Sequence, residues 1–543
     1  MKLGLEWIWR WRYRDLLVLC LFVLVGMATY VNSLGNPFHY DDQHYIEDNR
    51  NIRTLENIPR FFTNPRTIAA DPQKAGHYRP LVVTSYAINY ALGGLNPVGY
   101  HLVNLAFHVG SAFLVFLIVQ AMLGGMGNGG WAAPAAGIIF LVHPFNSEVV
   151  NYITARSSVM SGFFYLLGFY FWVRFRGLAS GNYSSTVFYI AFLLAFAAGM
   201  LSKEVVITLP VVLWLYDLYF GGRRLHASRS AHHALLSWPA CIPYIPFVFI
   251  VVIPYMIVRG SSFGGVIPHF NRDIWTNIFT GLPVLIQYWK MFLIPLPLTP
   301  VHSVEIYKTF WSFTVIHSTL MLVIYLAIAI LLSFILSRPW RLVSFFMLWF
   351  IIVLLPITIM PLNAIFQENM GYVAMVSFVI LAGVIMGELW KTRIRKVALG
   401  GLVLITIVYS AGVVQRNMVW RDDLTLWSDA AKKAPEIPIT HSSLGSAYRK
   451  AGMYDQAIGA YRKAQAVGGP KYYAAPYNLA QVYIAQERWD LAARELEKVK
   501  EILLDNSQNR DDLGIVYNDL GMVYGKSGQL ELAEKLFKEA QIK

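Results

Sequence analysis

Two adjacent carboxylates, Asp41 and Asp42, lie in an aromatic and histidine-rich stretch that reads NPFHYDDQHYIED over residues 36–48. The stretch follows the first long apolar run, residues 16–34, so it is predicted to begin where the chain leaves a membrane. A carboxylate can take a proton from a hydroxyl group, which makes the pair a candidate general base. A solvated loop is the simpler alternative, although ionisable groups at a membrane boundary favour function.

Further ionisable and aromatic residues are predicted to reach the same membrane face from other turns. They are Arg79 in the first loop, His143 and Glu148 with Arg156 soon after them, Lys203 and Glu204, and Glu368 with Tyr372. Cationic side chains can hold a departing phosphate group. Together with a carboxylate base, they suit the transfer of a group from a lipid-phosphate donor to a hydroxyl acceptor.

Each of these residues also has a structural interpretation. His143, which precedes a proline, can end a helix, and Glu148 is favoured near the start of the next one. Arg156 can pair with Glu148, and Lys203 can form a salt bridge with Glu204. The convergence of four distant segments on one face favours the functional interpretation, because ionisable residues within a membrane are costly to keep.

The composition predicts a polytopic membrane protein with some soluble mass attached. Of the 543 residues, 56% are hydrophobic and 14% are charged, whereas soluble domains carry about 25% charged residues. The formal net charge of +13 is explained by Lys and Arg at cytoplasmic loop ends, without a nucleic-acid partner. Cys20 and Cys241 are the two cysteines and cannot form a disulfide framework or a zinc site. The sequence contains no phosphate-loop or HExxH motif, so NTP hydrolysis and zincin proteolysis lack support.

Eleven apolar runs are predicted to span the membrane. They lie near residues 16–34, 98–122, 128–144, 149–173, 185–201, 204–220, 239–258, 311–336, 341–361, 371–390 and 397–416. The first is predicted to be retained, because the basic N-terminus lacks a small-residue cleavage site. The stretch 274–298 is also apolar, but its prolines and Lys290 predict a helix that lies in the membrane interface.

Basic residues predict the orientation of these spans. An inner N-terminus places basic clusters inside, as the positive-inside rule requires: Arg10, Arg12 and Arg14; Arg174 and Arg176; Arg223, Arg224 and Arg229; Arg338 and Arg341; and residues 391–396. The inner segment 123–130 carries no charge and does not inform the orientation. The outer face then holds loop 35–97, with an amphipathic helix predicted over 80–92, loop 259–310 and the C-terminus.

The last part of the chain contains an internal repeat. Leu444-Gly445, Leu479-Ala480 and Leu520-Gly521 recur at spacings of 35 residues (444 to 479) and 41 residues (479 to 520), followed in turn by Tyr448, Tyr483 and Tyr524 and by Ala457, Ala492 and Ala533. A period near 34 with small residues at helix crossings is typical of tetratricopeptide repeats. The longer spacing predicts an insertion near 503–511, and residues 420–438 are predicted to cap the array as a half-repeat. Such arrays bind peptides and proteins.

The order of these motifs resembles that of the C-type membrane glycosyltransferases that use polyprenyl-phosphate sugars. Within that class, the chain most resembles the transmembrane and tetratricopeptide-repeat-containing protein O-mannosyltransferases and their prokaryotic relatives. The matching segments are FHYDDQHYI after the first span, YRPL at 78–81, GYHLVNLAFHV at 99–109, HPFNSEVV at 143–150, ARSS at 155–158, LSKE at 201–204, and the repeats. The resemblance implies an all-α fold, with a transmembrane glycosyltransferase bundle over 1–416 and a repeat solenoid over 417–543.

The resemblance also implies roles for single residues. Asp41 or Asp42, with Asp42 preferred, is expected to activate or orient the acceptor hydroxyl, while the other carboxylate accepts backbone N–H bonds. The remaining candidates are expected to bind substrate: Arg79, His143, Glu148, Arg156, Lys203, Glu204, Glu368 and Tyr372. The family often shows a Glu-Arg-Tyr-like segment before a late span, whereas residues 367–372 read QENMGY and lack that arginine.

The implied substrates are a polyprenyl-phosphate-linked sugar, a hexose such as mannose, and Ser or Thr hydroxyls of exported proteins that the repeats recruit. Asp41, Asp42 and Glu148 offer oxygen ligands for a divalent cation, although related families include metal-independent members. Compact loops favour the bacterial inner membrane with periplasmic repeats, and the endoplasmic reticulum membrane is the eukaryotic alternative. A non-catalytic scaffold for secretion or surface-polysaccharide assembly and an oligosaccharide ligase are the alternative functions.

Overall fold

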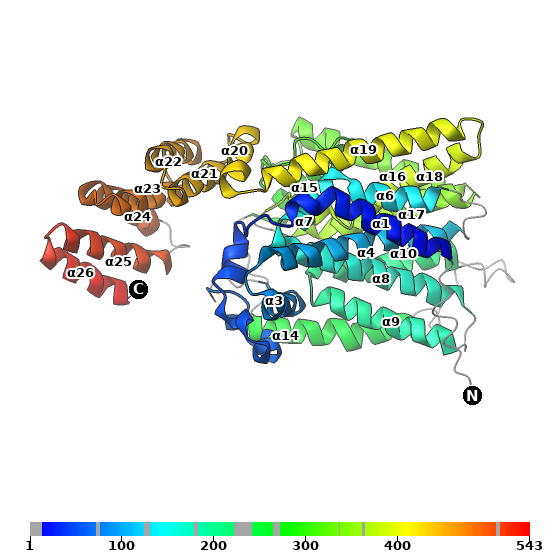
Figure 1. The fold of residues 1–543 in the computed structure, drawn as a ribbon, viewed down its shortest axis with the longest axis horizontal. Helices are drawn as coiled ribbons and strands as arrows, with labels where there is room; N and C mark the ends of the chain where they lie inside the picture. Colours follow the sequence, from blue (N-terminus) through cyan, green and yellow to red (C-terminus); the bar gives the residue numbers. More distant parts are fainter. Residues whose placement is uncertain are drawn as a thin grey trace. The chain divides into compact units, whose positions relative to one another are not determined.

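The computed structural model describes residues 13–71, 77–123, 131–178, 183–221, 242–263, 272–335, 337–360, 364–505 and 511–542. Within these ranges the chain forms helices joined by turns, with no strand, which confirms the predicted all-α fold. The chain divides into two compact units (Figure 1). The first contains Met1–Leu298 and Val304–Trp420, and the second contains Thr299–Ser303 and Arg421–Lys543.

Long apolar helices build the first unit. They are α1 (Tyr13–Tyr30), α4 (Pro97–Leu123), α8 (Arg156–Gly177), α9 (Tyr183–Met200), α15 (Ile274–Leu293), α16 (Phe313–Phe334), α17 (Arg338–Ile359), α18 (Met375–Trp390) and α19 (Arg395–Val419). Six helices among the described residues, α1, α4, α9, α16, α17 and α19, are long and apolar enough to cross a membrane. Since α8 packs against both α4 and α9, and α17 against α15, α16 and α18, these helices form one bundle.

Shorter helices complete the first unit. A bent pair, α6 (Ala132–Val142) and the segment Pro144–Asn151, turns by 54° and counts as a seventh candidate span if it is taken as one. The others are η2 (Val31–Ser33), η3 (Gln43–Glu47), η4 (Arg50–Arg53), η5 (Leu55–Asn57), α2 (Ile58–Phe61), η6 (Pro65–Thr67), α3 (Pro80–Gly93), η8 (Pro144–Ser147), α7 (Glu148–Asn151), η9 (Ile153–Ala155), η10 (Glu204–Thr208), α10 (Leu209–Phe220), η12 (Ile242–Tyr244), α13 (Ile245–Phe247), η13 (Val248–Val252), α14 (Ile253–Phe263) and η14 (Glu368–Gly371). The short helices of residues 43–67 and α3 gather at one end of the bundle (Figure 1).

Of the eleven predicted spans, six coincide with the candidate spans of the described residues, and a seventh does so if the bent pair is taken as one span. The remaining predicted spans are covered by helices with shifted or earlier ends. The predicted fourth span, 149–173, begins later in the structure, at Arg156, because the chain first turns through η8, α7 and η9. The predicted third and sixth spans are helices of 11 and 12 residues. The helix predicted over 80–92 is α3. The predicted basic residues Arg10, Arg12, Arg223, Arg224 and Arg229, most of segment 123–130, and Cys241 lie outside the described residues.

Helix α15, predicted to lie in the membrane interface, is not among the candidate spans. Pro283 lies within it. Its second half nevertheless packs into the bundle, since the Trp289 ring lies 5.5 Å from the Tyr325 ring and the Phe292 ring lies 6.1 Å from the Phe350 ring. The helix is therefore part of the core as well as of the loop.

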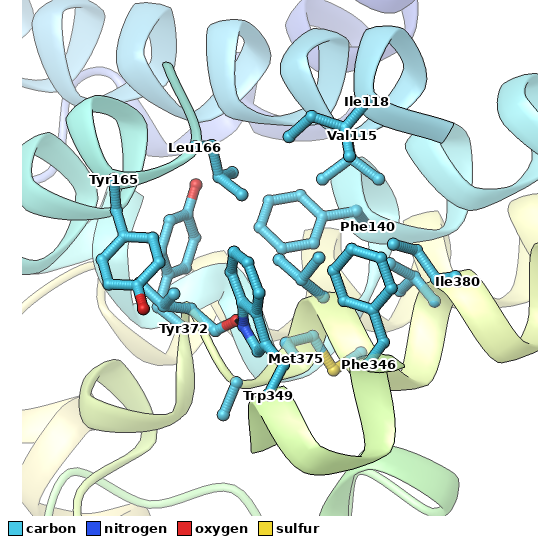
Figure 2. Close-up of a cluster of buried hydrophobic side chains, with 14 of the residues drawn as sticks. Val115, Ile118, Phe140, Tyr165, Leu166, Phe346, Trp349, Tyr372, Met375 and Ile380 are labelled. Carbon is cyan, nitrogen blue, oxygen red and sulfur yellow. Dashed lines mark hydrogen bonds between the residues drawn. The ribbon is translucent and has the colours of Figure 1, made fainter. Parts of the chain in front are cut away.

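Large apolar side chains from α4, α6, α8, α17 and α18 fill the core of the first unit (Figure 2). Tyr372, at the end of η14, lies among them and is 1% exposed. A Cβ atom on Gly162 of α8 would lie 2.6 Å from the Tyr372 ring, so this close approach requires glycine. The core therefore fixes η14 against α8.

The second unit is a stack of helix pairs. Its helices are α20 (Asp423–Lys433), α21 (Pro438–Lys450), α22 (Tyr454–Gly468), α23 (Ala474–Ala485), α24 (Trp489–Asp505), α25 (Asp511–Lys526) and α26 (Leu530–Ile542). A Cβ atom on Gly445 would lie 2.6 Å from the Tyr461 ring, which explains the small residue at this crossing. The predicted half-repeat is α20, which begins with a capping box at Asp422. Most of the predicted insertion, residues 506–510, lies outside the described residues.

Candidate active site

Asp42 holds the acidic loop in place. Its side chain is fully buried, and its two oxygens accept N–H bonds from the backbone of His39 at 3.0 Å and of Thr154 at 2.8 Å. Desolvation raises the pKa of Asp42 to about 6, although these hydrogen bonds favour the charged form. With both oxygens engaged by backbone amides, Asp42 has the role that the sequence analysis assigned to the second carboxylate.

Asp41 is the exposed member of the pair. Its Oδ2 atom accepts a hydrogen bond from the Tyr152 hydroxyl at 2.8 Å. Desolvation raises the pKa of Asp41, while the Tyr152 hydroxyl and the charge of His44 lower it. Adjacent side chains in a turn point in different directions, so the structure separates a buried structural carboxylate from an accessible one. In this geometry, backbone amides engage both oxygens of Asp42, whereas Asp41 accepts a hydrogen bond from the Tyr152 hydroxyl.

The residue before the pair has a strained backbone. Tyr40 has a φ of +52°, a left-handed conformation that bulky residues rarely adopt. Its ring lies 6.4 Å from that of Tyr152. Strain of this kind persists where the surroundings enforce it, and it is common at functional sites. In this loop, the left-handed turn immediately precedes Asp41.

Two arginines converge on one carboxylate next to this loop. Arg79, at the start of α3, lies 3.3 Å from Oε2 of Glu204, and Arg259 of α14 lies 3.9 Å from Oε1 of the same residue. Chiefly the charge of Arg79, together with desolvation, lowers the pKa of His77 to about 3. Because Glu204 balances one of the two arginine charges, the cluster retains a positive charge that suits an anionic ligand.

Lys203 adds a third cation to this cluster. Its Nζ atom donates to Oγ of Ser158 at 2.7 Å and to Oδ1 of Asn369 at 3.4 Å. Asn369 in turn donates to the carboxylate of Glu148, from its side chain at 2.8 Å and its backbone at 3.2 Å. Desolvation, followed by the charge of Arg79, lowers the pKa of Lys203 to about 7. A bound anion would favour its charged form.

The segment from Tyr152 to Ser158 connects all of these groups. Tyr152 contacts Asp41, the Thr154 amide contacts Asp42, Ser157 accepts from Arg79 at 3.4 Å, and Ser158 accepts from Lys203. The Tyr45 hydroxyl also experiences the charges of both Arg79 and Asp41. One short stretch before and at the start of α8 therefore contacts both the accessible carboxylate and two of the cations, Arg79 and Lys203.

Two of the predicted site residues are structural in this geometry. His143 is fully buried; its Nδ1 atom accepts the N–H of Phe145 at 3.2 Å and its Nε2 atom donates to the carbonyl of Phe292 at 3.0 Å. It therefore ends α6, as the structural interpretation of this residue proposed. Tyr372 lies in the core, where its hydroxyl lies 2.9 Å from Nδ1 of His108.

Arg156 is buried, and its guanidinium group holds neighbouring helices together. It donates to Asn104 at 2.7 Å, to Asn89 at 2.6 Å, to Ser85 at 3.1 Å and to the carbonyl of Tyr100 at 2.8 Å. These contacts tie α3 and α4 to α8, and they replace the expected pairing with Glu148. Glu368 is 1% exposed and lies in η14 beside Asn369, whose side chain reaches Glu148.

Several residues of the site were not among those predicted from the sequence. Arg259 and Tyr152 directly contact predicted site residues, and Ser158 and Asn369 bridge Lys203 to Glu148. Arg259 could have been noticed as the first charge after the apolar run 239–258. The roles of Tyr152 and Ser158 depend on backbone geometry that no spacing rule reveals.

The carboxylates proposed for a divalent cation do not form a common ligand set. Both oxygens of Asp42 accept backbone amides, and Glu148 is engaged by Asn369. No group of three or more His, Cys, Asp or Glu side chains in the described parts of the chain could hold a metal ion.

Comparisons with known proteins agree with the motifs. Family models described as tetratricopeptide repeat match residues 440–469 and 472–541. Protein O-mannosyl-transferase Tmtc2 of Drosophila melanogaster is 34% identical over 287 residues, which cover 51% of this chain and 29% of the relative. Human protein O-mannosyl-transferase TMTC3 is 22% identical over 569 residues, which cover 96% of this chain and 60% of the relative. The chain thus spans less than two thirds of the length of either relative.

Among solved structures, ArnT from Cupriavidus metallidurans bound to undecaprenyl phosphate is 15% identical, with a TM-score of 0.42 over 89% of this chain and 80% of that one. An Archaeoglobus fulgidus oligosaccharyltransferase is 12% identical, with a TM-score of 0.41 over 84% and 59%. The sequence relatives confirm the resemblance inferred from the motifs. The chain is a helical integral membrane protein with C-terminal tetratricopeptide repeats, and it is related to the transmembrane and tetratricopeptide-repeat-containing protein O-mannosyltransferases.

Proposed function

We propose that this chain is a membrane glycosyltransferase that moves a hexose, mannose in the first instance, from a polyprenyl-phosphate carrier to Ser or Thr hydroxyls of proteins. The observation that carries this proposal is that the segment Tyr152 to Ser158 contacts the accessible Asp41 carboxylate at one end and the cations Arg79 and Lys203 at the other. Arg259 joins Arg79 through Glu204. A base and an anion site next to each other are what sugar transfer from a phosphate carrier requires. The related protein O-mannosyl-transferases support the sugar and the acceptor class.

In the proposed reaction, Asp41 accepts the proton of the acceptor hydroxyl as its oxygen bonds to the anomeric carbon of the sugar. The bond between that carbon and the phosphate oxygen breaks, and its electron pair leaves with the polyprenyl phosphate. Arg79, Arg259 and Lys203 stabilise the charge that develops on the departing phosphate. Asp42 keeps the loop in place but takes no proton, because both of its oxygens are engaged by backbone amides.

The test is sugar transfer by the purified full chain in detergent. The protein is mixed with polyprenyl-phosphate mannose and a Ser- and Thr-containing acceptor protein, and the acceptor is analysed by mass spectrometry. We expect a mass increase of one hexose that is lost after β-elimination. If no donor sugar reaches the acceptor while the chain remains folded and binds the donor, the scaffold function replaces the transferase.

The repeats are proposed to recruit the acceptor protein. Deleting residues 440–543 is expected to raise KM for a protein acceptor far more than for a short peptide, because such arrays bind proteins along their length. Steady-state kinetics with the two acceptors check this expectation. An equal loss on both acceptors would count against a recruiting role, and the donor KM serves as the control for an intact first unit.

The orientation of the site is part of the same proposal. The predicted inner N-terminus places the acidic loop and the repeats on the outer side, which is the periplasmic side of a bacterial inner membrane or the lumen of the endoplasmic reticulum. The carrier lipid then reaches the site from the outer leaflet. Reporter fusions after residue 93 in α3 and after Lys543 would report the side directly.

A further inference from the structure

We propose that Tyr152 is a positioning residue for Asp41 and that the ring of Trp420 fixes Tyr152 in place. The inference rests on the proposed function, since it names the residue that directs the proposed base. Within the part of the chain that the structure describes, Tyr152 supplies the side chain that donates to the Asp41 carboxylate, at 2.8 Å on Oδ2. That bond leaves the other oxygen of Asp41 for the acceptor hydroxyl.

The position of Tyr152 is itself determined by two contacts. Its backbone N–H donates to the carbonyl of Glu148 at 2.8 Å, which closes α7. Its ring stacks on Trp420, with ring centroids 5.8 Å apart and an interplanar angle of 23°. Aromatic stacking of this kind restricts rotation of the ring. The hydroxyl of Tyr152 is thus directed at the acidic loop.

Trp420 is held from two sides. It is 2% exposed, and its carbonyl accepts a hydrogen bond from Nε2 of His39 at 2.7 Å. Its backbone N–H donates to Asn417 at 3.2 Å, and Asn417 is fully buried between the end of α1 and Asn151 of α7. The end of α19 is therefore anchored on the same loop that carries the acidic pair.

These contacts form a connected ring of residues around the acidic pair. His39 contacts Trp420, Trp420 stacks on Tyr152, and Tyr152 donates to Asp41. Asp42 closes the ring on its other side, because it binds the amides of His39 and Thr154. The two adjacent carboxylates thus reach the residues on either side of Ile153, which explains how they point in different directions.

The test is a kinetic comparison of Tyr152→Phe with the unaltered full chain. The variant keeps the stacked ring and removes the hydroxyl, so we expect kcat to fall by about 10- to 100-fold, the loss that removing a hydrogen bond to a charged group produces. The KM for polyprenyl-phosphate mannose should stay within about twofold. A change in folding would alter donor binding as well, so an unchanged KM shows that the loss of kcat is not a loss of structure. Tyr78→Phe is the matched control, since its hydroxyl donates to the carbonyl of Phe62 in the same loop at 3.2 Å.

A double-mutant cycle separates this inference from the proposed function. In an Asp41→Asn background, Tyr152→Phe should cost less than about twofold further, because the two residues act through one group. If Asp41→Asn is inactive while Tyr152→Phe has a normal kcat, the positioning role is wrong and the base assignment stands. If Asp41→Asn retains full activity, both are wrong.

Trp420 supplies an independent check. Trp420→Leu should lower kcat in the same way as Tyr152→Phe, and Trp420→Phe should restore most of the loss because it keeps an aromatic surface. Equal kcat values for Trp420→Leu and the unaltered chain would contradict the role of the stack.

Discussion

Replacing Asp41 with asparagine is expected to lower the rate of sugar transfer by about 10²–10⁴-fold, which is the usual contribution of a positioned base. Asparagine keeps the shape of the side chain but cannot take the proton of the acceptor hydroxyl. Because Asp41 accepts a bond from Tyr152 and does not contact the cation cluster, affinity for the lipid donor should remain nearly unchanged. The measurement is kcat with a peptide acceptor, together with donor binding in detergent.

Two other acids of the same loop provide the comparison. Asp48→Asn removes an exposed charge six residues after Asp42 and should leave kcat unaltered. Asp42→Asn weakens the bonds to the His39 and Thr154 amides, so it should lower the melting temperature as well as the rate. A near-normal rate for Asp41→Asn would show that the base lies elsewhere.

The pH dependence follows from the same assignment. A general base must be ionised, so the rate should rise with pH through the pKa of Asp41. Desolvation raises that pKa, which places the acid limb above the value of about 3.9 that an unperturbed aspartate shows. Asp41→Asn should remove this limb from the rate profile of whatever activity remains.

The sequence predicted which segments meet but not what each side chain does there. The convergence of loop 35–97, the start of α8, the turn at Lys203 and the turn at Asn369 was expected from span counting alone. A difference in role between Asp41 and Asp42 was expected, but not which of them accepts the backbone amides, because that depends on the left-handed turn at Tyr40 and on the amide of Thr154. Both features are backbone geometry, which the spacing of residue types along the sequence does not reveal.

Burial explains the other differences between expectation and structure. Hydropathy marks a polar residue in an apolar run as unusual, but it does not separate a ligand-binding group from one that ties helices together. Arg156 and His143 illustrate this point, since both are fully buried and bonded to neighbouring helices. The repeats were easier to predict, because each pair of helices reuses the same small residues at its own crossing, such as Gly445 against Tyr461.

The second large expected effect concerns the cation cluster. The double variant Arg79→Gln/Arg259→Gln is expected to lower kcat/KM for the lipid donor by about 10²–10⁴-fold, since each charge-assisted bond to a phosphate contributes about 1.5–3 kcal/mol. The loss has two physical sources. The departing phosphate loses its charge stabilisation, and Glu204, which both arginines neutralise, is left as an unpaired acid that repels the phosphate.

A third substitution separates these two sources. Adding Glu204→Gln to the double variant removes the repulsion and the unpaired charge, so it should restore the melting temperature and part of the donor affinity. It should not restore kcat, because no arginine remains to hold the departing phosphate. Arg60→Gln is the matched control, since Arg60 is an exposed arginine of loop 35–97, to which Arg79 also belongs, and contacts Asn57. The measurements are donor KM, kcat and thermal unfolding of these three variants and of the unaltered chain in the same detergent. A double variant with unaltered donor kinetics would mean that the phosphate binds outside this cluster, and recovery of kcat on adding Glu204→Gln would mean that the arginines serve only to neutralise Glu204.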